Sequence, residues 1–177
     1  MPHPWNKTAR YDGTDYELDA HFAPLRRMVT LPGGRQQAVE FRFDYHCFTE
    51  EDVKGSDHRT KFVDVGAPAD DSRVFCPQRW LLLFGVRTDL DRAIDSARLL
   101  DVGGHNWMWL RRVPGIGSPH AVFLKVAPFP LAGHVIVNIN SAHVRNNPPA
   151  RGHAATVHLF PALVALTLVS GRLQGTP

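Results

Sequence analysis

The stretch that decides the fold is HAVFLKVAPFPLAGHVIVNINSAHVR, residues 120–145. Apolar and polar side chains alternate on each side of a short loop that contains two prolines and a glycine. An alternation with a period of two predicts two strands joined by that loop. Continued past Ile139, the same alternation places a hydroxyl, an imidazole and a guanidinium on the face that begins as core, from Ser141, His143 and Arg145.

The composition is that of an ordinary globular protein. The chain has 177 residues, 44% hydrophobic and 21% charged, which predicts one domain with a sizeable core. Its net charge of +3 and its ten histidines permit an RNA or phosphate partner without requiring one. The two cysteines make no disulfide framework. The sequence shows no signal segment, and its longest apolar run, residues 159–169, falls short of a membrane span, so we expect a cytoplasmic protein that does not bind membranes.

The regularity of the hydrophobic pattern divides the chain into two parts. Residues 1–35 are the least patterned and are expected to be loosely ordered, while residues 36–177 are expected to form one domain. The cleanest alternation lies at residues 38–48 and predicts a half-buried strand whose core side chains are Val39, Phe41, Phe43, Tyr45 and Cys47.

The remaining elements complete an α+β pattern. Short strands are predicted at residues 73–76 and 155–160, a longer one at 106–113, and a closing helix at 161–170. Thr88 is a good N-cap for a helix that reaches Leu100 and ends at the glycines that follow. The predicted fold is therefore a mostly antiparallel sheet packed on two or three helices.

Several strong signatures do not occur. Neither Gly-rich segment lies between a strand and a helix with the spacing of a phosphate-binding loop. The sequence also contains no HExxH, no paired CxxC and no GxSxG. Nucleotide cofactors, the common zinc centres and α/β-hydrolase chemistry are therefore not expected.

A weaker pattern allows a metal site. If the strands at residues 38–48 and 73–76 pair, imidazole and thiolate ligands could meet at one end of the sheet, from His46, Cys47, His58 and Cys76. The simpler interpretation is that Cys47 is a small core residue, because it shares its face with Tyr45, and that His46 points the other way. We therefore expect no bound metal or cofactor and keep zinc as an alternative.

A second pattern allows catalysis without metal. RNA cleavage by attack of a 2′-hydroxyl needs a base, an acid and cations that stabilise the charged transition state. The predicted catalytic groups lie on neighbouring strands and are His143, His120, Arg145, Arg111 and Ser141. Phosphates and a stacked base would be held by Lys125, Arg112 and Trp109. The alternative is that all of these are ordinary residues of a solvated sheet edge.

Three strings carry a resemblance to known proteins. YHCFTE at residues 45–50, RVFCPQRW at 73–80 and SAHVR at 141–145 together resemble a group of uncharacterised bacterial and prophage proteins, over about residues 38–171. That resemblance implies a mobile-element setting and no particular reaction. The order of a helix before three strands is also similar to that of RelE-type and barnase-type ribonuclease toxins.

These observations lead to one functional prediction and one alternative. The prediction is a metal-independent ribonuclease of the toxin kind, which would have RNA as substrate and a protein inhibitor as a possible partner. The alternative is a non-catalytic binding or assembly protein of a mobile element, with or without a stabilising zinc ion.

Overall fold

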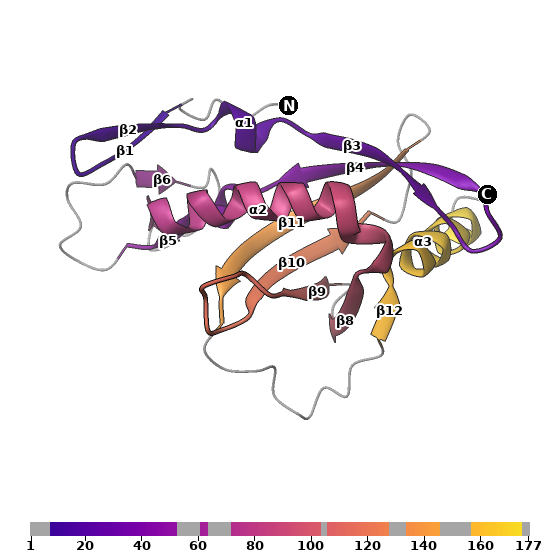
Figure 1. Ribbon diagram of the computed structural model, residues 1–177. Helices are drawn as coiled ribbons and strands as arrows, with labels where there is room; N and C mark the ends of the chain where they lie inside the picture. The colour runs from indigo at the N-terminus through magenta and orange to yellow at the C-terminus, as the bar shows by residue number, and fades with distance from the viewer. Residues whose placement is uncertain are drawn as a thin grey trace.

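The computed structural model describes residues 8–52, 61–63, 72–103, 106–127, 134–145 and 157–174 (Figure 1). Its centre is a seven-stranded sheet with the order β12-β8-β9-β10-β11-β4-β3. The strands of this sheet are β3 (Leu25–Thr30), β4 (Gln36–Phe43), β8 (Arg98–Gly103), β9 (Asn106–Arg111), β10 (His120–Val126), β11 (His134–Val144) and β12 (Val157–Leu159). Neighbouring strands are antiparallel except for β11 and β4, which are parallel.

Smaller elements surround this sheet. A hairpin joins β1 (Thr8–Tyr11) to β2 (Thr14–Glu17), and a three-stranded sheet contains β5 (Thr49–Glu51), β7 (Ser72–Phe75) and β6 (Lys61–Val63). The helices are α1 (Asp19–Phe22), α2 (Pro77–Ala93) and α3 (Phe160–Gln174), with short 3-10 turns η1 (Tyr45–Cys47) and η2 (Ile94–Ser96). The predicted class, a mostly antiparallel α+β fold with two or three helices, is confirmed.

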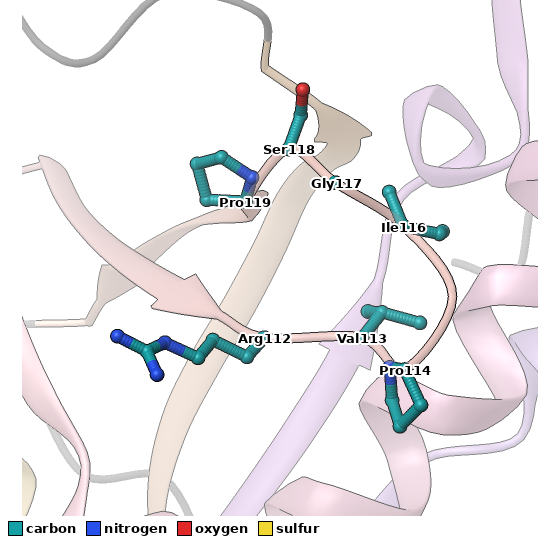
Figure 2. A pocket seen from close by; sticks show the side chains of 7 residues that line it. All are labelled: Arg112, Val113, Pro114, Ile116, Gly117, Ser118 and Pro119. Atoms are coloured by element: carbon teal, nitrogen blue, oxygen red, sulfur yellow. The ribbon is translucent and has the colours of Figure 1, made fainter.

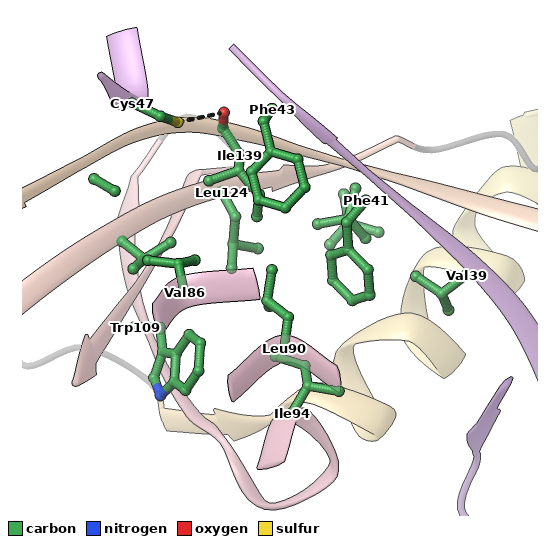
Figure 3. Close-up of a cluster of buried hydrophobic side chains, with 14 of the residues drawn as sticks. Val39, Phe41, Phe43, Cys47, Val86, Leu90, Ile94, Trp109, Leu124 and Ile139 are labelled. Carbon is green, nitrogen blue, oxygen red and sulfur yellow. Dashed lines mark hydrogen bonds between the residues drawn. The ribbon is translucent and has the colours of Figure 1, made fainter. Parts of the chain in front are cut away.

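The hydrophobic core lies between the sheet and the two long helices. Val86 and Leu90 of α2 pack with Phe41, Leu124 and Ile139 of the strands (Figure 3). Helix α3 contributes to the same cluster, with the Phe160 ring stacked 5.7 Å from that of Phe41. We call this side of the sheet the helical face, and the other side the open face.

A β-bulge in β11 decides which side chains reach each face. Leu124 pairs with Ile139, but the preceding Phe123 pairs with Ser141, so Asn140 is an extra residue in the ladder. One extra residue reverses the alternation beyond it. Ile139 and Ala142 therefore both pack in the core, whereas Ser141 and His143 lie on the open face. The expectation that a single face runs from core into Ser141, His143 and Arg145 is wrong for this reason.

Other predictions are corrected by pairing between distant segments. Part of the stretch expected to be loosely ordered contains β1, β2, α1 and β3, and β3 pairs with β4 at the edge of the central sheet. The strand predicted at residues 38–48 ends at Phe43, and η1 then carries Tyr45 and Cys47 into the core.

The predicted helix from Thr88 to Leu100 is also wrong. Thr88 lies inside α2, where its hydroxyl donates to the carbonyl of Phe84 at 3.1 Å, and Leu100 belongs to β8. A separate finding concerns membranes: within the described ranges, no helix combines the length and the apolar character needed to cross one.

Candidate functional site

An open pocket of about 560 Å³ lies where β11 passes η1, β5, β7 and the first turn of α2. Its walls carry two imidazoles, two carboxylates, two guanidiniums and a hydroxyl, from His46, Glu50, Glu51, Arg73, Arg79, Ser141 and His143. Acid–base groups and cations are thus gathered in one place, on segments that are far apart in the sequence.

His143 is the central acid–base group of this pocket. Its Nδ1 lies 3.1 Å from the hydroxyl of Ser141, and its ring stacks on Phe123 with 5.4 Å between ring centroids. Burial lowers its pKa, and the positive charges of Arg79, Arg145 and Arg73 lower it further. The imidazole is therefore neutral at pH 7 and able to accept a proton.

Two arginines are fixed in the pocket by one buried residue, Thr49. Arg73 donates from Nε to the Thr49 hydroxyl at 2.9 Å and from Nη2 to its carbonyl at 3.2 Å. Arg79 donates from Nη1 to the same carbonyl. These bonds use only part of the donors of each guanidinium, so both side chains keep N–H groups for an anion.

The remaining polar groups of the pocket are a histidine and two carboxylates, from His46, Glu50 and Glu51. The Nδ1 atom of His46 lies 2.5 Å from Asp44 Oδ1, so the ring donates from Nδ1 to this carboxylate and keeps Nε2 for another partner. Glu50 lies beside the thiol of Cys76, where burial and then the Glu50 carboxylate raise the thiol pKa. Cys76 is therefore a protonated thiol at neutral pH.

His120 and Arg111 lie on the helical face, away from this pocket. In the register of β10 and β11, Ala121 pairs with His143 while His120 pairs with Val144, so the two histidines point to opposite sides of the sheet. His120 is 0% exposed and its Nδ1 lies 2.9 Å from Nη1 of Arg111. Arg111 in turn donates through Nε to Asp89 of α2 at 2.8 Å. The expected convergence of His120 and Arg111 with His143 is therefore wrong.

The other residues predicted for the site do not line the pocket around His143 either. Trp109 packs in the core on the helical face, so it is not available to stack a base. Arg112 lines a different pocket, formed by residues 112–119 between β9 and β10 (Figure 2). Lys125 is exposed on the open face. Arg145 follows His143 and reaches across to Met108, with 3.6 Å between Nη1 and Sδ.

The metal pattern does not assemble in the part of the chain that the structure describes. Cys47 is fully buried and its thiol donates to the carbonyl of Ile139 at 3.2 Å (Figure 3). Burial raises the pKa of this thiol. Among described residues, no three His, Cys, Asp or Glu side chains come together as a metal site. His58 lies outside the described residues.

A comparison with known protein families decides where the chain belongs. Residues 8–167 match the model of the YjaZ family, and this range includes every residue of the pocket. The chain belongs to the YjaZ family. Neither the curated proteins nor the solved structures contain a match.

Membership in the YjaZ family agrees with the expected likeness to a bacterial family over residues 38–171, and it brings no reaction with it. The comparisons lend no support to the expected similarity to RelE-type or barnase-type toxins.

Four pocket residues of this YjaZ-family chain were not predicted from the sequence, namely Glu50, Glu51, Arg73 and Arg79. Glu50, Arg73 and Arg79 lie within the strings that carry the family resemblance, but periodicity attaches no chemistry to any of the four. They meet His143 only because β5 pairs with β7 and because η1 packs beside β11. No local pattern in the sequence encodes either contact.

Proposed function

We propose that this protein cleaves RNA without a metal ion and that His143 is its proton-transfer group. The observation that carries the proposal is the surroundings of His143, a neutral imidazole in the field of Arg73, Arg79 and Arg145. Positive charges around an uncharged base favour an anionic substrate whose reaction releases a proton. A phosphodiester with a neighbouring 2′-hydroxyl has this chemistry.

The pocket residues suit each step of such a cleavage. If His143 donates Nδ1–H to Ser141, the lone pair on Nε2 accepts the proton of the 2′-hydroxyl. The 2′ oxygen then bonds to phosphorus while Arg73 and Arg79 stabilise the phosphorane oxygens. The bond to the 5′ oxygen breaks, and protonated His46 gives that oxygen its proton. The products are a 2′,3′-cyclic phosphate and a 5′-hydroxyl.

The test is cleavage of a short RNA by the purified protein in the presence of a chelator. We expect the His143→Ala variant to lose a factor of about 100 to 10,000 in rate, because one acid–base group contributes that much. His158→Ala is the matched control, since His158 packs on Trp107 at the opposite edge of the sheet. An RNA with 2′-O-methyl groups throughout is expected to stay intact.

Two results contradict the proposal. One is cleavage that survives in His143→Ala at the rate of the control variant. The other is cleavage of the 2′-O-methyl RNA, because that chain has no hydroxyl to attack the phosphorus.

A further inference from the structure

The open face of the central sheet, the side opposite α2 and α3, carries an ordered row of polar side chains. Arg42 of β4 pairs with Asn138 of β11, Asn138 pairs with Lys125 of β10, and Lys125 pairs with Asn106 of β9. Directly paired residues project to the same side of a sheet, so the four side chains form one row across four strands. Cations and amides alternate along it, and Arg42 and Lys125 are two strand spacings, about 10 Å, apart.

The charge of this face is strongly one-sided. Arg26, Arg42, Lys125 and Arg145 project from it or lie at its end. In the seven strands, only Glu40 brings a carboxylate to this side, and it is 2% exposed. Glu40 already pairs with Arg26 at 2.6 Å and with Arg42 at 2.7 Å. The Arg26 and Arg42 side chains remain 73% and 49% exposed, so both can also contact an anionic partner.

The same face leads directly into the pocket. Phe123 lies two residues from Lys125 on β10 and pairs with Ser141. Its ring stacks on the imidazole of His143. A chain held by the polar row therefore passes a half-buried aromatic ring before it reaches the acid–base group. Cations and amides beside an aromatic ring are groups that hold single-stranded RNA.

We propose that single-stranded RNA lies across the open face, with its phosphates on Lys125 and Arg42 and its bases near Asn138 and Phe123. The inference rests on the proposed function for the choice of RNA over other polyanions. The binding itself needs no cleavage, so the two can fail separately.

The test measures binding of a fluorescent single-stranded 2′-O-methyl RNA by anisotropy, because this probe has no attacking hydroxyl. We expect Lys125→Glu to weaken binding about fivefold or more and to reduce the slope of log Kd against log salt by about 0.7. Lys125 is exposed, so the fold is retained. The matched control is Arg92→Glu, an identical change in sign at an exposed position of α2 on the helical face. It is expected to bind the probe like the wild type.

The outcomes separate the inference from the proposed function. Equal weakening of RNA binding by Lys125→Glu and Arg92→Glu would mean that net charge alone drives binding. Unchanged binding by Lys125→Glu would mean that the polar row does not contact the RNA. Either result overturns the inference, as does tighter binding of a duplex of the same length. Loss of probe binding in Lys125→Glu alone supports it even if His143→Ala shows no cleavage defect.

Discussion

At the scale of single residues, Gly85 shows how α2 accommodates a buried cation. A Cβ atom at this position would lie 3.1 Å from Nη2 of Arg111. That guanidinium cannot easily move, because it is bonded to Asp89 on the next turn of α2 and to His120. Glycine inside a helix costs about 1 kcal/mol relative to alanine, so the helix gives up intrinsic stability to leave room for the ion pair.

This conflict predicts opposite effects of one substitution in two backgrounds. Gly85→Ala should lower the free energy of unfolding by about 1 kcal/mol in the wild type, because displacing Arg111 weakens its buried hydrogen bonds. In an Arg111→Met background the same change should raise that free energy by about 0.5–1 kcal/mol through helix propensity. Urea unfolding of the wild type, the two single variants and the double variant measures both effects in one double-mutant cycle. The same sign in both backgrounds would rule out the steric explanation.

At the scale of elements, the bulge in β11 joins the core to the site. Val137 and Ile139 face the helices, and beyond the extra residue Asn140 the hydroxyl of Ser141 and the imidazole of His143 face the pocket. A regular strand would instead turn these two side chains into the core. Because the bulge places polar groups next to a buried strand without burying them, it is a functional feature of the fold.

Two single-residue deletions in β11, one at the bulge and one in the regular part of the strand, are expected to have different effects on stability. Deleting Asn140 should leave a folded protein that loses only about 1 kcal/mol, because each remaining residue keeps its partner on β10 and its face. Deleting Asn138 makes Val137 and Ile139 neighbours, so one of them must leave the core at a cost of several kcal/mol. Thermal unfolding of both variants is the measurement. Similar losses in the two deletions would contradict the assigned register.

At the scale of the whole molecule, two buried histidines make the fold sensitive to acid. His21 lies among Phe48, Trp80 and Phe84, and neither of its ring nitrogens has a hydrogen-bond partner in the structure. Burial lowers the pKa of His21 to about 4, and burial together with Arg111 lowers that of His120 to about 4. Both rings are neutral in the folded protein at pH values where the unfolded chain binds a proton.

The sign of the pH effect follows from this difference. Between pH 6.5 and pH 4 the unfolded chain holds up to two more protons at these sites, so the free energy of unfolding falls as the pH falls. The slope should approach about 2.7 kcal/mol per pH unit near pH 5. His21→Phe should remove about half of that slope, and should stabilise the protein at pH 7 by about 1 kcal/mol because no unpartnered nitrogen remains buried. Urea titrations at several pH values test this, and an unchanged slope would contradict it.

Local patterns in the sequence were sufficient for much of the fold. Alternation in residues 120–145 is dense enough to predict β10, β11 and the loop between them, because side chains on a sheet must alternate between core and solvent. The same reasoning predicts that Phe41, Phe43, Tyr45 and Cys47 are buried.

The tertiary structure alone decided the rest. The bulge at Asn140 reverses an alternation that looks continuous in the sequence, since the pairing with β10 and not the strand itself determines where the extra residue lies. The pocket depends on contacts between β5, β7, α2 and β11, so Glu50, Arg73 and Arg79 could be joined to His143 only after folding. The sequence by itself determined the strands with dense alternation, β10, β11 and most of β4, and the burial of their apolar side chains, because these depend on local periodicity. Which polar side chains come together in the pocket depends on strand register and on contacts between distant segments, and local periodicity encodes neither.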